Sequence, residues 1–419
     1  MEQLETSEQA KSRGSTSVIH RKLVQVLTPS TTSEGNIGPD AVHLLAVKET
    51  CNELENGSTV IGFAFVDCAA LKVWVGSIDD DASCAALGAL LMQVSPKEVI
   101  YNARGLSKDA QKALKKYSST GPAAPLLSPV QPGSDFVDPA EVKNFLDLKG
   151  YFKGFCNKWD HTFDEANHDV ALCALGNLVN HLKRLMLDEV LHNGDVLSYE
   201  VYRGCLKMDG QTLVNLEIFN NNADGSPSGT LYMYLDNCVT SPGKRLLRNW
   251  ICHPLKHVEK INHRLDVVER LIENSDATLS TAQYLRKLPD LDRLLGRVKA
   301  SIQSSEALLL PLIGAKILKQ RVKVFGLLVK GLRIGLDLLR LLQKECLTPS
   351  LAKVVSLPVL DGDNGLDKFS PNLKQQLIDF PIFRNPLWAS SQTLVGRQVQ
   401  YPRECGPALY PLKKKKCSC

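Results

Sequence analysis

The hydrophobic periodicity of the chain changes near residue 166, and this change constrains the fold more than any other feature of the sequence. Before it, residues 41–118 combine apolar, β-branched runs with short amphipathic segments. After it, residues 166–190 and most of 240–345 carry apolar side chains at helical spacing. Alternating strands and helices form layered α/β domains, whereas consecutive amphipathic helices pack on one another. We therefore predict an α/β domain followed by a mainly α-helical domain.

The α/β domain is predicted from the order of its elements. An apolar run at 58–68 (STVIGFAFVDC) and a second at 71–78 (LKVWVGSI) form two strands of a hairpin, because the residues between them turn the chain. A helix, a short strand and an amphipathic helix follow at 84–94, 97–103 and 106–117.

Several helix starts are predicted from polar residues that cap the first turn. Asp81 or Ser83 would cap the helix after the hairpin, and Asp138 and Ser241 each precede a proline at the first helical position. The helical domain is then predicted to contain segments at 241–252, 256–274, 276–300 with a break at Pro289, and 315–345.

Composition narrows the class of protein. No apolar run is long enough to span a bilayer, and the polar N-terminus is not a secretory signal. We therefore predict an intracellular protein that does not associate with a membrane. The 12 cysteines include no CxxC pair, which argues against a zinc site. Residues 240–345 hold 20 Lys and Arg against 10 Asp and Glu, a net charge of +10. Such a basic half indicates either a polyanionic neighbour, above all nucleic acid, or a solvated helix surface.

The segment TSPGKRLLRNWICHPL (240–255), with LPDLDRLLGRV (288–298), resembles the core, or lever, domain of the MutS family of DNA mismatch-repair proteins. Upstream, FVDCAALKVWVGSI (65–78) and CAALGALLMQVSPKEVIY (84–101) resemble the family's connector domain, which has an RNase-H-like layout. They look most similar to the plant branch of the eukaryotic mismatch-reading subunits. The residues that carry the core motif are Thr240, Ser241, Pro242, Gly243, Arg245, Leu246, Leu247, Arg248, Trp250, His253, Pro254, Leu255, Arg264, Asp266, Asp290, Leu291, Arg293 and Arg297.

We predict a structural role for this motif. The basic residues of 244–248 would be surface charges of a helix that buries Leu246, Leu247 and Trp250. No residue of the chain is predicted to be catalytic or to bind a metal or cofactor.

The RNase-H-like layout raises the alternative of a nuclease. Asp67 ends the first strand, where such a nuclease carries a metal-binding carboxylate, but two-metal hydrolysis needs several converging carboxylates. Asp79, Asp80 and Asp81 follow the second strand and are better placed to cap the next helix. We therefore favour a turn-forming role for Asp67.

Two motifs of the family have no counterpart in the sequence. The family's mismatch reader uses a Phe-x-Glu motif, and no phenylalanine precedes Phe63. Its ATPase uses a G-x-x-x-x-G-K-[ST] loop, and the single Gly-Lys pair, Gly243-Lys244, is followed by arginine. This pair is predicted to start a helix. ATP and Mg²⁺, cofactors of the intact family, are thus not expected to bind this chain.

The domain organisation follows from these segments. We predict disorder at 1–18, a remnant of the mismatch-reading domain and a linker at 19–38, the connector at 39–160, the core/lever at 161–345, and the start of the clamp followed by an irregular tail at 346–419. In the remnant, Val24, Val26 and Leu27 are predicted to form a short strand.

The C-terminal KKKKCSC resembles the double-prenylation ending of Rab-type GTPases, but that signal is read together with a Rab fold. We favour an aberrant tail from alternative splicing, a frameshift or a faulty gene model. A non-specific DNA contact is still predicted from Lys413, Lys414, Lys415 and Lys416.

The resemblance implies nuclear DNA mismatch repair, double-stranded DNA as the ligand of the intact family, and a heterodimer with another MutS homologue. We predict a chain truncated at both ends that acts as a scaffold or partner-binding fragment. A regulator that competes with intact homologues and a non-functional fragment are the alternatives.

Overall fold

The computed structural model describes most of the chain up to Lys344. The described residues are 2–3, 7–14, 16–23, 26–31, 38–51, 59–118, 125–130, 135–152, 168–202, 204–303 and 314–344. The clamp start, the irregular tail and its four lysines therefore lie outside them. None of the described helices combines the length and the apolar character that crossing a membrane requires.

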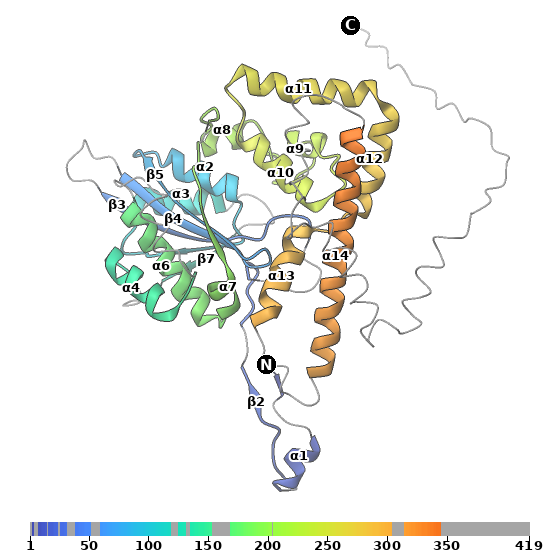
Figure 1. Cartoon of the computed structure of the whole chain (residues 1–419). Helices are drawn as coiled ribbons and strands as arrows, with labels where there is room; N and C mark the ends of the chain where they lie inside the picture. Colours follow the sequence, from blue (N-terminus) through green and yellow to red (C-terminus); the bar gives the residue numbers. More distant parts are fainter. Residues whose placement is uncertain are drawn as a thin grey trace, which may run out of the picture. The chain divides into compact units, whose positions relative to one another are not determined.

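A six-stranded sheet forms the first part, in the order β7-β6-β3-β4-β5-β8 (Figure 1). Strands β3, β4 and β5 form an antiparallel meander, and β6, β7 and β8 extend it through parallel pairs. The strands are β3 (Leu44–Cys51), β4 (Thr59–Asp67), β5 (Lys72–Asp80), β6 (Glu98–Tyr101), β7 (Leu126–Pro129) and β8 (Asp195–Ser198). The predicted α/β domain is thereby confirmed.

Helices cover both faces of this sheet (Figure 1). Because almost every residue of β4 is buried, the strand must be apolar on both faces, as its sequence TVIGFAFVD is. One face packs on α2 (Ala85–Val94) and α3 (Lys108–Ser118), and the other on α4 (Pro139–Lys149), α6 (His168–Arg184) and α7 (Asp188–Asn193).

Helix α6 lies directly on the sheet, so the predicted boundary between connector and core at residue 160 is too early. A Cβ atom on Gly62 of β4 would lie 2.4 Å from the carbonyl carbon of Val170 in α6. Only glycine permits this approach of two backbones. The sequence of α6 is amphipathic, and such a pattern is equally compatible with packing on a sheet or on other helices.

The second part is helical, as predicted. Thr230, Asp209 and Asn274 cap three of its helices through side-chain oxygens. The break predicted at Pro289 separates α12 from α13 and is confirmed. The helices are α8 (Gly210–Asn215), α9 (Leu231–Leu235), α10 (Ser241–Cys252), α11 (Val258–Glu273), α12 (Ser275–Lys287), α13 (Leu291–Gln303) and α14 (Gly314–Lys344).

The predicted caps are wrong at two helices and confirmed at a third. The Asp138 side chain accepts from the Ala140 N–H at the start of α4, as expected. At α10 the cap is Thr240, whose hydroxyl accepts from the Gly243 N–H, and Ser241 is already helical. At α2 the carboxylate of Asp80, still in β5, accepts from the N–H groups of the first turn.

The N-terminal segment differs from the disorder expected at 1–18. Residues 2–3 form β1, which pairs with β2 (Arg21–Lys22), and residues 7–12 form helix α1. Glu8 in the first turn and Lys11 in the last favour the helix through its dipole. The short strand expected at 24–27 falls partly outside the described residues, and β2 precedes it.

Candidate functional site

Arginines of the core motif join the helical part to the sheet. Arg245 of α10 forms a two-pronged ion pair with Asp290, just before α13, with Nη1–Oδ2 and Nη2–Oδ1 distances of 2.8 and 3.0 Å. Paired, charge-assisted hydrogen bonds of this geometry are stronger than neutral ones. The Asp290 carboxylate also accepts from the Arg293 N–H at 3.4 Å. It therefore caps the first turn of α13 and at the same time pairs with Arg245 of α10.

Arg293 extends this contact to the segment that leads into β3. Its Nη1 and Nη2 donate to the carbonyl oxygens of Gly38 and Asp40 at 2.7 and 2.6 Å. Arg245 Nη1 donates to the Pro39 carbonyl at 3.3 Å. Three consecutive carbonyls of residues 38–40 are thus held by two guanidinium groups.

Arg248 makes a second contact with the sheet domain. Its Nη2 donates to the carbonyl of Met92, in the last turn of α2, at 3.1 Å. A cation at a helix C-terminus is favoured by the helix dipole. The guanidinium carbon lies 3.6 Å from the ring centroid of Phe219, which covers the other side of the group. We call Arg245, Arg248, Asp290, Arg293 and their acceptors the arginine joint.

Close packing accompanies the arginine joint. A Cβ atom on Gly296 of α13 would lie 2.4 Å from the carbonyl oxygen of Ala69, in the turn between β4 and β5. Lys72 at the start of β5 forms an ion pair with Asp292 of α13 at 3.1 Å. Helix α13 therefore contacts the sheet through backbone packing as well as through charges.

The charges of the joint shift one another's ionisation. Burial opposes the charged form of Asp290, but the hydrogen bonds and charge of Arg245 outweigh it and lower the pKa of Asp290. Burial also opposes the charged form of Arg245, yet its pKa is raised by Asp290. The pKa of Arg293 is lowered by burial and by the nearby charge of Arg245. Asp290 is thus the carboxylate that pairs with both arginines, and the charge of Asp67 also favours their charged forms.

The predicted buried face of α10 is wrong for Leu246 and Trp250, whereas Leu247 is half-buried. Leu246 and Trp250 are 49% and 43% exposed, whereas Arg245 and Arg248 lie on the same side as Cys252, which is 1% exposed. The two arginines sit there because their long side chains bring the guanidinium groups to backbone carbonyls of the sheet domain. Arg245 and Arg248 are therefore contacts rather than surface charges, whereas Lys244 is partly exposed and pairs with Asp236.

The other motif residues lie around the joint rather than in it. Arg264 of α11 stacks on Trp250 at 3.7 Å, and the Arg297 Nε donates to the Arg293 carbonyl at 3.4 Å. His253 ends α10 through Asn249. Pro242 lies in the first turn of α10 and Leu247 in its middle. Pro254 and Leu255 bridge to the 205–206 segment, Asp266 lies on α11 and Leu291 begins α13.

The acceptors of the joint were missed by the sequence analysis. Residues 38–40 lie where the predicted linker at 19–38 meets the predicted connector, and a backbone carbonyl has no residue-type signal. Phe219 and Gly296 were also missed, although a glycine within an otherwise amphipathic helix indicates close packing.

Asp67 forms a turn, as favoured above. Its Oδ1 accepts from the N–H groups of Ala69 and Ala70 at 2.9 and 3.1 Å. In the described part of the chain, no three His, Cys, Asp or Glu side chains are grouped so that they could hold a metal ion. The role of Asp67 is thus to form the turn against which α13 packs.

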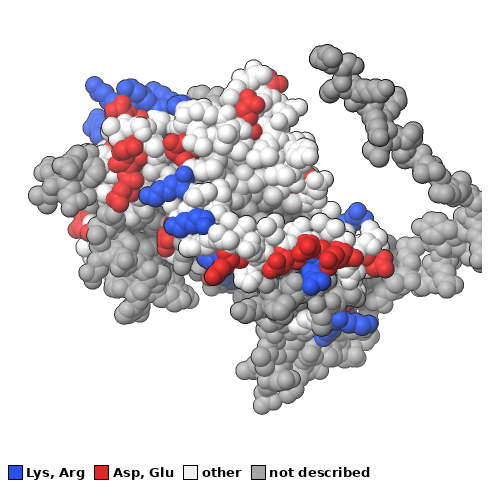
Figure 2. Space-filling view, turned by 90° about the horizontal axis from the view of Figure 1, so that it is seen from above, with Lys and Arg blue, Asp and Glu red and all other residues white. Residues whose placement is uncertain are grey.

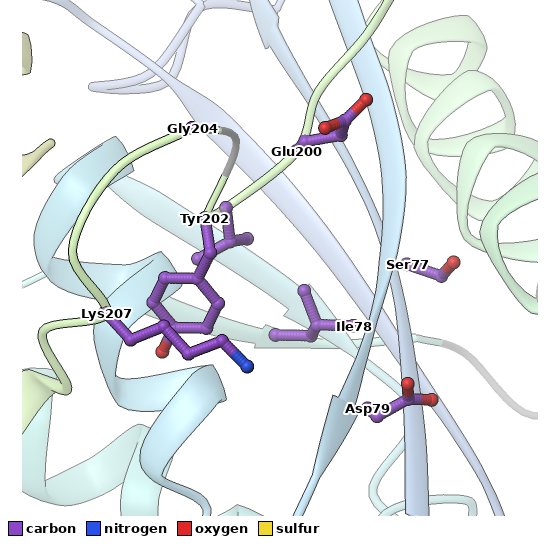
Figure 3. Close-up of a pocket in the computed structure, with 8 residues that line it drawn as sticks. Ser77, Ile78, Asp79, Glu200, Tyr202, Gly204 and Lys207 are labelled. Atoms are coloured by element: carbon purple, nitrogen blue, oxygen red, sulfur yellow. The ribbon is translucent and has the colours of Figure 1, made fainter. Parts of the chain in front are cut away.

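A pocket of about 420 Å³ lies beside the edge of β5 and the 200–207 segment (Figure 3). Its charged side chains are Asp79, Glu200 and Lys207. Figure 3 shows the two carboxylates pointing away from Lys207, whose amine lies 5.5 Å from the ring centroid of Tyr202. The charged groups do not converge on one point, so this pocket suggests no chemistry.

Comparison with known proteins agrees with the fold and the motif. The model of MutS domain II matches residues 42–194, and the model of MutS domain III matches residues 211–381. The sheet domain with α6, and the helices with the arginine joint, correspond to these two regions. The chain belongs to the MutS family of DNA mismatch-repair proteins.

Individual relatives support the plant branch. The chain is 62% identical to DNA mismatch repair protein MSH7 of Arabidopsis thaliana over 388 residues, which are 92% of the chain and 35% of that protein. It is 30% identical to MSH6 of the same plant over 347 residues and to Msh6 of Homo sapiens over 325 residues, covering 26% and 23% of those proteins. The chain thus spans about a third or less of the length of these relatives.

Proposed function

We propose that this chain is a partner-binding scaffold of a nuclear MutS-type repair complex. In this proposal it docks on another MutS homologue and itself neither reads mismatches nor hydrolyses ATP. The observation that carries the docking is the apolar stripe of α11. Val258, Ile261, Leu265, Val268 and Ile272 follow helical spacing, yet they are 36% to 75% exposed and α11 buries none of its residues. Such an exposed stripe is typical of a protein-binding helix.

The surroundings of the stripe fit a protein partner. Figure 2 shows acidic side chains gathered over α11, and its exposed acids are Glu259, Asp266, Glu269 and Glu273. A polar rim around an apolar seam is the usual anatomy of a protein interface. If this chain binds an intact partner through the α11 stripe, it would also compete with full-length homologues for that partner, which is the regulatory role considered above.

Docking is tested by co-purification with a second, full-length MutS homologue. Leu265→Glu places a charge in the middle of the stripe and is expected to weaken binding about tenfold or more, since it removes the burial of one leucine side chain. Arg270→Glu, on the opposite side of α11, is the matched control and is expected to leave binding unchanged. Failure of the unmodified chain to bind any MutS homologue would rule out the scaffold proposal.

Purified chain is expected to show no ATP turnover above background. The Gly243 N–H donates to the Thr240 hydroxyl, and Lys244 forms an ion pair with Asp236 at 2.6 Å. Both residues of this Gly-Lys pair are therefore engaged in contacts at the start of α10. A phosphate loop would need free amides and a lysine aimed at phosphates. The measurement is phosphate release with and without DNA. Steady turnover that co-purifies with the chain through two unrelated columns would contradict the proposal.

A further inference from the structure

Residues 26–31, which we call the strap, attach to the sheet domain through polar groups rather than apolar ones. The side chain of Leu27 is 62% exposed, whereas Ser30 is 1% exposed. The Val26 N–H donates to the carbonyl of Leu185, just after α6, at 3.0 Å. A buried hydroxyl beside an exposed leucine is the reverse of the usual distribution. Apolar burial therefore contributes little to the docking of the strap.

The carboxylate of Glu98 is the acceptor that holds the buried end of the strap. Glu98 begins β6 and is 2% exposed. Its Oε2 accepts from the Ser30 hydroxyl at 2.8 Å, and its Oε1 accepts from the hydroxyl of Ser128 in β7 at 2.7 Å. Hydrogen bonds to an ionised acceptor are roughly twice as strong as neutral ones. The strength of this attachment therefore depends on the charge in the surroundings of Glu98.

His181 of α6 is the titratable side chain that faces this carboxylate. Its Nε2 lies 3.6 Å from Oε1 of Glu98. This nitrogen is buried and makes no hydrogen bond to the residues that the structure describes. Buried polar atoms without a partner are rare in folded proteins, and each one calls for an explanation.

Burial keeps His181 uncharged at neutral pH. It lowers the pKa of His181, because a charged ring is poorly solvated there; Glu98 opposes this shift and Arg184 of α6 adds to it. The buried thiol of Cys68, after β4, also lies near Glu98, and burial raises its pKa, with smaller contributions from Asp67 and Glu98. The strap and β7 contain no titratable side chain.

We propose that the strap is a pH-sensitive attachment, which Glu98 holds while His181 is neutral and which a proton on His181 releases. The docked strap covers Glu98, since the Ser30 hydroxyl and the carboxylate are buried together. When the strap leaves, water reaches this region and burial no longer opposes the charged imidazole. The inference goes beyond partner docking, because it concerns the sheet domain and not the α11 stripe.

The direction of the pH dependence follows from proton linkage. The undocked state binds more protons than the docked state between about pH 6.5, the ordinary pKa of histidine, and the lower pKa of docked His181. Docking is therefore at full strength above about pH 6.5. It weakens as the pH falls through this window and then levels off, because His181 is protonated in both states.

Hydrogen exchange of the strap amides in the full chain, corrected for the intrinsic effect of pH, tests the proposal. Protection is expected to fall below about pH 6.5 by up to about tenfold for each pH unit, the limit for one proton. His181→Gln removes the titrating group and should keep the strap protected throughout. His257→Gln, at an exposed histidine just before α11, is the matched control and should retain the pH dependence of the unmodified chain.

Two further variants test the role of Glu98 itself. Glu98→Gln keeps the shape and removes the charge, and Ser30→Ala removes the donor of the strap without altering the sheet. Each is expected to lower the protection of the strap at neutral pH by about tenfold or more, through the loss of one charge-assisted hydrogen bond. Ser228→Ala, at an exposed serine of the helical part, is the matched control and should have no effect.

Four results would overturn the proposal. The first is constant protection of the strap across the pH range. The second is unchanged protection in Ser30→Ala, which would mean that Glu98 does not hold the strap. The third is a loss at acid pH that persists in His181→Gln, which would assign the pH dependence to another group. The fourth is a parallel loss in β4, which would mean that acid unfolds the sheet domain instead of releasing the strap.

Discussion

Replacement of Arg293 by alanine is expected to destabilise the protein by about 3 kcal/mol, because it removes one member of a buried charge cluster. The side chain is 7% exposed, and it donates to the carbonyls of Gly38 and Asp40. Without it these carbonyls are left without the guanidinium that held them, and Asp290 retains only Arg245 as a charged partner. Urea unfolding measures the loss, and hydrogen exchange of 38–43 should rise with it.

Two further variants make this prediction specific to the arginine joint. Arg293→Lys keeps the charge but cannot span two carbonyls with a planar fork, so it should lose a large part of the stability. Arg286→Ala removes an exposed arginine of α12 and should change stability by less than about 0.5 kcal/mol. If Arg293→Ala were no worse than Arg286→Ala, the arginine joint would not hold the 38–40 segment.

Much of the fold was predictable because its signals are local. The strands at 58–68 and 71–78, the break at Pro289 and the extent of α14 follow from periodicity and from proline, and the structure confirms them. The motif residues at 240–297 were also recognisable from residue type and spacing. Arg245, Asp290 and Arg293, which that pattern singled out, are the side chains that the structure brings together.

The rest depends on contacts between residues distant in sequence. Strand β3 was missed, and β8 pairs with β5 across more than a hundred residues. The orientation of α10 was misjudged because periodicity places leucine inside and arginine outside. Periodicity alone does not reveal that backbone carbonyls of the sheet domain accept hydrogen bonds from the arginines of α10. Leu246 is exposed and Arg248 stacks on Phe219 for that reason.

Replacement of Phe63 by alanine is expected to destabilise the sheet domain by about 4 kcal/mol. The ring is 0% exposed, lies edge-on to Tyr199 with centroids 6.0 Å apart, and has its Cζ 2.7 Å from where a Cβ on Gly76 would be. Loss of the ring leaves a cavity between β4 and the segment after β8, which close packing cannot fill without moving backbone. The change in unfolding free energy is again read from urea titration.

Tyr234→Ala is the matched control, since this aromatic ring of α9 is 82% exposed and its removal creates no cavity. It should alter stability by less than about 0.5 kcal/mol. Phe63→Leu is expected to recover part of the loss, because it refills some of the volume. If Phe63→Ala matched Tyr234→Ala instead, the ring would not be enclosed as described. The packing between β4 and the chain beyond β8 would then contribute little to the stability of the sheet domain.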